Sequence, residues 1–250
     1  MNEKPNILLL FTDQQRHDSI HSAGFPYMKT PNMDRLVKDG CLFKKAYSTN
    51  PVCMPARHYM LTGTTARHHG YYGNTCNPIK DEGLPTIPRV LSDNGYTSAA
   101  IGKMHFFPVR CHHGFDEMHL MEELPNFREE DAYITYLAEN GYSKLRNIHG
   151  VRPHIYHLPQ KALVPEQYHG ENWVADKTID FLSHNKNRPF FCMSGWIKPH
   201  PPWNIPESMI DYYKDAELPE PISISREFPI FAGESRWHGD HYPKEFKRKI

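Results

Sequence analysis

A short apolar run near the start of the chain, residues 6–11, limits the folds that this sequence can adopt. Flanked by Pro5 and Thr12, it suits a β-strand buried on both faces, as in a parallel sheet. Two later runs, 97–101 and 190–194, also predict buried strands. Segments that predict helices lie between and around them, at residues 30–40, 55–63, 86–94 and 172–185. Strands that alternate with helices favour an α/β fold, with a mostly parallel, mixed sheet sandwiched by helices.

Prolines and glycines mark the ends of the predicted helices. Pro31 and Pro55 are expected at the first helical position. A backbone N–H at that position would have no partner within the helix, so proline, which lacks it, costs no hydrogen bond. Gly63 and Gly95 are expected to end their helices. With Pro55 as the first helical residue, Cys53 lies just before a helix N-terminus, where free N–H groups and the helix dipole favour an anion.

The length of 250 residues suits one large domain better than two. We therefore expect residues 1–250 to form a single domain. The polar, proline-interrupted stretch at 122–167 predicts an insertion over the edge of the active site. From Pro206 onward the pattern weakens to loops and short helices.

Composition and charge exclude several classes of protein. Lys plus Arg and Asp plus Glu number 29 each, so bulk charge predicts neither a nucleic-acid partner nor a membrane-surface partner. The five cysteines are irregularly spaced and form no CxxC pair, which is not the pattern of a disulfide framework. The opening resembles no signal peptide and no apolar segment is long enough to span a membrane, so we expect a cytoplasmic protein.

Distinctive polar residues follow all three predicted strands. They are, in chain order, Asp13 and Gln14, Lys103 and His105, and Lys198 and His200. In open α/β sheets, ligands bind beyond the carboxyl ends of the strands. Three such groups in one chain therefore predict a functional site rather than ordinary loop polarity.

The segment CMPAR at residues 53–57 is the strongest local signal. Arg57 lies in the first turn of the predicted helix, from which it can reach back toward Cys53. The pair is a suitable cradle for a sulfate or phosphate group. Taken alone, the same pattern also fits a buried structural cysteine beside a capped helix.

Five segments match a known family in order, between about Pro5 and Trp203. They are KPNILLLFTDQQ, TPNMDRLVKDGCLFKKAYS, PVCMPARHYMLTG, DNGYTSAAIGKMHF and FFCMSGWIKPHPPW. Together they resemble the formylglycine-dependent sulfatases of the alkaline phosphatase superfamily. The resemblance implies that family's fold and the hydrolysis of small-molecule or carbohydrate sulfate esters to an alcohol and inorganic sulfate.

The resemblance implies that Cys53 is oxidised to formylglycine by a formylglycine-generating enzyme. One hydroxyl of the hydrated aldehyde attacks sulfur and the alcohol leaves. Deprotonation of the second hydroxyl then expels sulfate and restores the aldehyde. Ala56 stands where many members have serine, which is a minor departure.

Asp13 and Gln14 match the family's first pair of metal ligands, to which the modified Cys53 adds another. Oxygen ligands suit a hard divalent cation, with Ca²⁺ expected first and Mg²⁺ or Mn²⁺ as alternatives. Many relatives have Asp at the position of Gln14. Formylglycine-dependent phosphonate and phosphodiester hydrolases can carry Gln there, so this second substrate class stays open.

The resemblance also implies roles for the basic residues. Arg57 is expected to hold the diol and the carboxylates beside the metal. Lys103 is expected to bind a sulfate oxygen, and His105 to contact the diol and assist the release of sulfate. His200 fits a sulfate contact or the acid that protonates the leaving oxygen, and Lys198 fits a charge at the pocket rim.

The sequence departs from the family pattern near its end. Sulfatases carry a later Asp-His-Gly or Asp-Asn-Gly turn that supplies the remaining metal ligands. The segment Gly239-Asp240-His241 partly matches this turn in sequence, but no apolar strand precedes it. Residues 246–250 resemble the start of a helix, so we expect a truncated chain. A third interpretation is therefore an inactive fragment that binds at most an anion or a partner.

Overall fold

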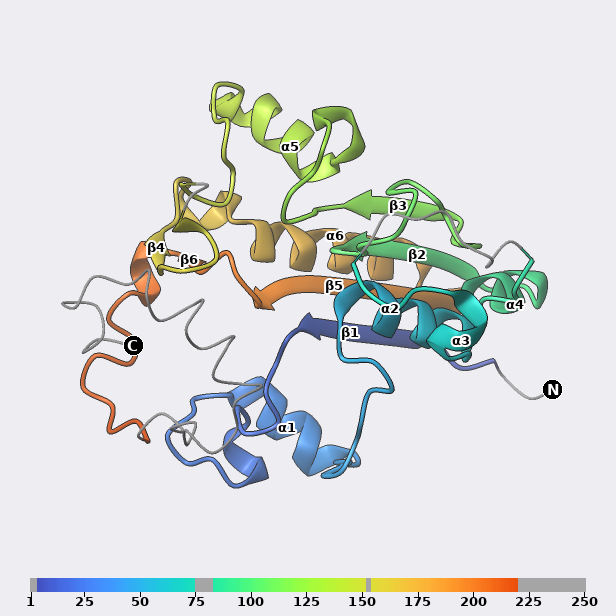
Figure 1. Cartoon of the computed structure of the whole chain (residues 1–250), viewed down its shortest axis with the longest axis horizontal. Helices are drawn as coiled ribbons and strands as arrows, with labels where there is room; N and C mark the ends of the chain where they lie inside the picture. The colour runs from blue at the N-terminus through green and yellow to red at the C-terminus, as the bar shows by residue number, and fades with distance from the viewer. Residues whose placement is uncertain (1–3, 75–82, 152–153, 220–250) are drawn as a thin grey trace. The chain divides into compact units, whose positions relative to one another are not determined.

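Four parallel β-strands form the central sheet, in the order β1-β5-β2-β3 (Figure 1). They are β1 (Ile7–Asp13), β2 (Thr97–Gly102), β3 (Glu117–Leu120) and β5 (Phe190–Pro199). The structure is a computed structural model that describes residues 4–74, 83–151 and 154–219. The predicted α/β fold with a mostly parallel sheet is confirmed. The sequence did not predict β3, and β5 runs on to Pro199, so Lys198 lies inside that strand.

The chain divides into two units, Met1–Tyr212 and Tyr213–Ile250. All the helices and strands named here belong to the first unit. The segment Gly239-Asp240-His241, which only partly matches the family's later ligand turn, and the predicted helix start at 246–250 lie outside the described residues. The single domain and the insertion at 122–167 stay predictions.

Six α-helices accompany the sheet in the described part of the chain. They are α1 (Pro31–Asp39), α2 (Cys53–Thr62), α3 (Ala66–His69), α4 (Ile87–Asp93), α5 (Ala132–Leu137) and α6 (Gly170–Asn185). Gly63 ends α2 in the left-handed conformation, with its N–H donating to the Tyr59 carbonyl at 2.8 Å, as the sequence predicts. Among the described residues, no helix combines the length and the apolar character needed to span a membrane.

Successive side chains of a strand point to opposite sides of the sheet. In β2 and β5 both sets of side chains pack against helices. Ala99 and Cys192 pack with residues of α5 and α6 in one buried cluster. Ala100 and Met193 pack with Leu61 of α2 in a second cluster on the other face. The helical layers therefore hold the carboxyl ends of these strands in fixed positions.

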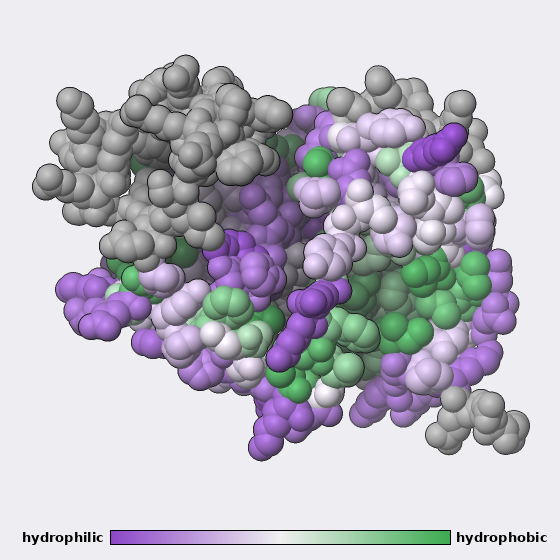
Figure 2. Space-filling view, turned by 60° about the horizontal axis from the view of Figure 1, so that its bottom comes forward, coloured by the Kyte–Doolittle hydropathy of each residue, from purple (hydrophilic) through white to green (hydrophobic). Residues whose placement is uncertain are grey.

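Strand β1 is less buried than its apolar sequence predicts. Ile7, Leu9 and Phe11 pack against the cluster that contains α2. Leu8 and Leu10 face the opposite side and are 40% and 50% exposed. Figure 2 shows apolar residues gathered toward the centre and lower right of the face in view. The expectation that β1 is buried on both faces is wrong for the described residues, because the face that carries Leu8 and Leu10 is partly exposed.

Shorter elements connect the main ones. They are the 3₁₀ helices His21–Ala23, Arg128–Glu130, Glu166–Tyr168 and Glu207–Met209, the π-type turn Ala138–Tyr142, and the paired strands β4 (Gln160–Lys161) and β6 (Asn204–Ile205).

Two glycines let β2 and β5 approach closely just before the candidate site. Gly102 has a φ of +87°, and a Cβ there would lie 2.0 Å from the Gly195 carbonyl oxygen. A Cβ on Gly195 would lie 2.2 Å from the Lys103 carbonyl oxygen. The Lys103 N–H donates to the Gly195 carbonyl at 2.8 Å. The glycine pair therefore sets where Lys103 leaves the sheet.

We expect Gly195→Ala to lower the free energy of unfolding by about 1–3 kcal/mol, because the added methyl group must push β5 away from the Lys103 backbone. Urea denaturation measures the effect. Gly73→Ala is the matched control, since a Cβ there meets nothing within 4 Å. A change no larger than that of the control would contradict the close approach.

Candidate active site

Polar residues from three strand ends meet at the carboxyl edge of the sheet. Asp13 ends β1, Lys103 follows β2, and His200 follows β5 directly. The His200 N–H donates to the Asp13 carbonyl at 3.1 Å, which ties the ends of β1 and β5 together. Parallel pairing thus brings together residues that are far apart in the sequence.

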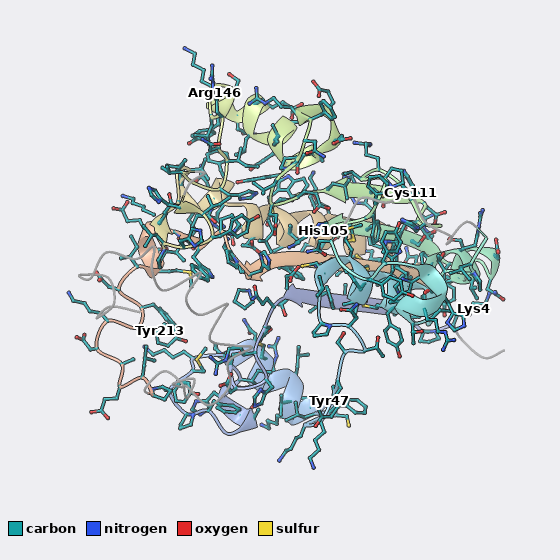
Figure 3. The ribbon with its side chains drawn as sticks, viewed as in Figure 1. Lys4, Tyr47, His105, Cys111, Arg146 and Tyr213 are labelled. Carbon is teal, nitrogen blue, oxygen red and sulfur yellow. The ribbon has the colours of Figure 1, made fainter. Side chains whose placement is uncertain are left out.

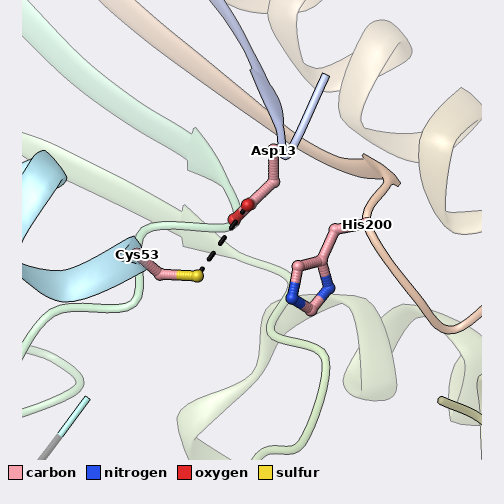
Figure 4. Close-up of side chains that lie close together, drawn as sticks. All are labelled: Asp13, Cys53 and His200. Atoms are coloured by element: carbon pink, nitrogen blue, oxygen red, sulfur yellow. Dashed lines mark hydrogen bonds between the residues drawn. The ribbon is translucent and has the colours of Figure 1, made fainter. Parts of the chain in front are cut away.

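Asp13 lies at the centre of this group. Its Oδ2 is 2.8 Å from Lys103 Nζ and 3.1 Å from Arg57 Nη2. Its Oδ1 is 3.8 Å from Cys53 Sγ (Figure 4). Burial alone would raise the pKa of Asp13, but the charges of Lys103 and Arg57 outweigh it and hold the pKa below its usual value. Asp13 is therefore an ionised carboxylate with one oxygen facing Cys53.

Lys103 is fully buried between two carboxylates. Its Nζ lies 2.6 Å from Glu123 Oε2 as well as 2.8 Å from Asp13. Burial lowers the pKa of Lys103, but Glu123 and Asp13 outweigh that effect and raise it above the usual value. The ammonium is therefore charged, and two of its three protons are directed at carboxylates.

Glu123 is a site residue that the sequence reasoning missed. Its Oε2 also lies 3.1 Å from His200 Nδ1, and its Oε1 accepts a hydrogen bond from the Tyr156 hydroxyl at 2.8 Å. Glu123 follows β3, so the rule of polar residues after strands would have found it if β3 had been predicted. The neighbouring Glu122 accepts hydrogen bonds from the Met104 and His105 N–H groups, and this fixes the turn after β2.

Cys53 is the first residue of α2 rather than a residue before it, which corrects the predicted helix start. Pro55 is the third residue, a position that also tolerates proline because the first-turn N–H groups have no partner within the helix. The Met54 N–H donates to Asn74 Oδ1 at 3.0 Å, so fewer N–H groups face an anion than predicted. Burial raises the pKa of the Cys53 thiol, which keeps it protonated and weakly nucleophilic at neutral pH.

Arg57 is a buried residue that holds two strand ends in place. Its side chain is 1% exposed and packs over the Phe11 ring at 4.8 Å. Nη1 donates to the Lys103 carbonyl at 2.6 Å while Nη2 pairs with Asp13. One planar guanidinium therefore fixes the ends of both β1 and β2.

A cleft of about 500 Å³ opens on this group. Its lining includes Asp13, Gln14, Cys53, Arg57 and His200. The structure thus brings five of the predicted site residues to one cleft, and Lys103 joins them through its contact with Asp13.

Two predicted residues lie elsewhere. His105, labelled in Figure 3, lines a neighbouring cavity of about 180 Å³ with Met54, Phe106 and Glu123. Burial lowers the pKa of His105. Lys198 donates to the Pro202 carbonyl and to Asn204 Oδ1, and burial lowers its pKa to about 8. Their expected contacts with the diol and the substrate stay predictions.

The cleft supplies part of the ligand set of a hard cation. Asp13 Oδ2 is occupied by Lys103 and Arg57, so Oδ1 is the oxygen available to an ion. Gln14 is exposed beside it in the cleft. One ligand atom each of Asp13, Cys53 and His200 lies within 4.8 Å of the others. Ca²⁺ takes about six to eight oxygens, so Asp13 and Gln14 fit such an ion but do not fill its shell.

The chain belongs to the sulfatase family, whose model matches residues 5–222. An arylsulfatase from Clostridium perfringens is 32% identical over 232 residues, which is 88% of this chain and 48% of that protein. An N-acetylglucosamine-6-O-sulfatase from Bacteroides thetaiotaomicron is 27% identical over 223 residues, 89% of this chain and 35% of that protein. The chain thus spans about half, or less, of the length of these curated relatives.

The fold has a close match among solved structures. A phosphonate monoester hydrolase from Silicibacter pomeroyi superposes with a TM-score of 0.75 at 22% identity, over 93% of this chain and 50% of that one. At this identity the likeness concerns the fold alone. It confirms the α/β architecture that the resemblance implied.

We expect Arg57→Lys to lower the free energy of unfolding by about 2 kcal/mol or more, because one ammonium cannot replace the two divergent hydrogen bonds of the guanidinium. Urea denaturation provides the measurement. The exposed Arg67 of α3 offers the control, since Arg67→Lys should change stability by less than about 0.5 kcal/mol. Equal effects of the two substitutions would show that Arg57 does not clamp the site.

Proposed function

We propose that this chain provides the nucleophile and the first metal ligands of a sulfate-ester hydrolase, with Cys53 as the residue converted to formylglycine. The observation that carries the proposal is the position of Cys53. Its sulfur lies 3.8 Å from the Asp13 carboxylate, in a cleft that also contains Arg57 and His200. The CMPAR motif and membership of the sulfatase family support it.

Formylglycine at residue 53 would supply a hydrated aldehyde, one of whose hydroxyls attacks sulfur. Asp13 and Gln14 would hold a divalent cation, Ca²⁺ first and Mg²⁺ or Mn²⁺ as alternatives, which supplies positive charge to the reacting oxygens. Lys103 keeps its charge in the buried site and stabilises negative charge that develops on the sulfate group. His200 exchanges a proton with the leaving oxygen.

The proposed substrates are sulfate esters of carbohydrates or of small aromatic alcohols. The names of the two curated relatives, an arylsulfatase and an N-acetylglucosamine-6-O-sulfatase, support this class. A phosphonate monoester or phosphodiester is the second candidate, because Gln14 stands where many sulfatases have Asp. Both candidates use the same nucleophile and cleft.

The test is maturation of Cys53. When the chain is expressed together with a formylglycine-generating enzyme, mass spectrometry of the peptide containing residue 53 should show the aldehyde or its hydrate. The exposed Cys41, which lacks the motif, is the internal control and should remain a thiol. The matured protein should hydrolyse an aryl sulfate faster than the matching aryl phosphodiester, and Cys53→Ala should reduce turnover by at least about 10³-fold.

Two results would contradict the proposal. An active protein whose Cys53 is an unmodified thiol would exclude formylglycine as the nucleophile. Full conversion of Cys53 without turnover of either ester would favour the inactive fragment. A higher rate on the phosphodiester would reassign the substrate class without changing the nucleophile.

A further inference from the structure

Glu123 adds a second carboxylate to a site that already contains Asp13. Its side chain is 14% exposed, and both oxygens have partners. Oε2 contacts Lys103 Nζ at 2.6 Å and His200 Nδ1 at 3.1 Å, and Oε1 accepts from the Tyr156 hydroxyl at 2.8 Å. Burial raises the pKa of Glu123, but Lys103 outweighs this and lowers it below the usual value. Glu123 is therefore a rigidly held anion.

The contacts of His200 determine which of its ring nitrogens carries a hydrogen. Nδ1 contacts two atoms that can only accept, Glu123 Oε2 and the Pro201 carbonyl oxygen. A hydrogen on Nδ1 satisfies both acceptors, whereas a lone pair there would face two oxygens. The other ring nitrogen, Nε2, lies on the side of Cys53 (Figure 4). Nε2 is therefore the nitrogen that can exchange a proton with a group bound beside Cys53.

We propose that Glu123 is a positioning residue, which holds His200 with Nδ1–H directed at its carboxylate and Nε2 directed at the ester oxygen that leaves. The inference rests on the proposed hydrolase function. In the step it serves, His200 carries a hydrogen on each ring nitrogen. A bond forms between sulfur and the hydroxyl oxygen at residue 53, whose proton passes to solvent in the cleft, and the sulfur–oxygen bond to the leaving group breaks. The leaving oxygen keeps the electron pair of that bond and takes the proton from Nε2. A carboxylate that orients an imidazole in this way fixes both its tautomer and its angle.

The packing around His200 supports the assignment. The Tyr156 ring meets the His200 ring edge-on, with centroids 6.3 Å apart, and its hydroxyl holds the other oxygen of Glu123. The His200 backbone is fixed by its hydrogen bond to Asp13. Tyr156 and Glu123 therefore contact the His200 ring, while Asp13 holds its backbone. These contacts leave the ring little freedom to rotate.

A purely structural role for Glu123 predicts a different outcome. If Glu123 only neutralises Lys103, its replacement lowers the rate of hydrolysis of all substrates by the same factor. If it positions the proton donor, its replacement matters most where the leaving group needs a proton. An acidic phenol leaves without one, whereas the alkoxide of a sugar does not.

The first test compares two leaving groups in the matured protein. We expect Glu123→Gln to lower kcat for a sugar sulfate by about 10- to 100-fold, with a smaller change in KM. For para-nitrophenyl sulfate the loss should be less than about 3-fold, because the phenolate leaves without protonation. Glu139→Gln, the same change at an exposed glutamate, is the control and should alter neither rate. Equal losses on both substrates would overturn the positioning role.

The second test needs no turnover and therefore separates this inference from the proposed function. Nitrogen NMR shifts of the histidine-labelled wild-type chain report which ring nitrogen is protonated, and the signals lost in His200→Gln identify His200. We expect a hydrogen on Nδ1 of His200. A neutral ring whose only hydrogen is on Nε2 would overturn the inference, whether or not the protein hydrolyses sulfate esters.

Discussion

The buried ion pair between Asp13 and Lys103 joins the ends of two strands that are not neighbours in the sheet, because β5 lies between them. Arg57 donates to the Asp13 carboxylate and to the Lys103 carbonyl, and Glu123 shares the Lys103 ammonium. A buried charge that loses its partner costs several kcal/mol. The position of each group therefore depends on the others, and the cleft beside Cys53 takes its shape from this set of contacts.

The sequence predicts those parts of the site that depend on local pattern. A short apolar run bounded by Pro5 identifies β1, so the polar residue at its end, Asp13, is found without any knowledge of the fold. The parallel arrangement then requires Lys103 and His200 to lie at the same edge as Asp13. Cys53 and Arg57 are separated by about one helical turn, so their common direction follows from helix geometry.

The remaining features depend on tertiary contacts that no local pattern reveals. Strand β3 has only four residues, with the sequence EMHL, too short and too polar to be recognised, and Glu123 was missed with it. Tyr156 reaches Glu123 from a distant irregular segment. His105 was expected in the cleft because it follows a predicted strand and because the family resemblance implies a contact with the diol. Instead, His105 lines the neighbouring cavity. Its backbone there is left-handed, with a φ of +51°, and its N–H donates to the Glu122 carboxylate.

The most direct test of this account is a double-mutant cycle on the ion pair. The free energy of unfolding is measured for the wild type, Asp13→Asn, Lys103→Met and the double variant. Each single substitution should cost about 3–5 kcal/mol, because each leaves a buried charge with fewer partners. The double variant should lose at least about 1 kcal/mol less than the sum of the single losses. Additivity within about 0.5 kcal/mol would contradict the claim that Asp13 and Lys103 organise the site.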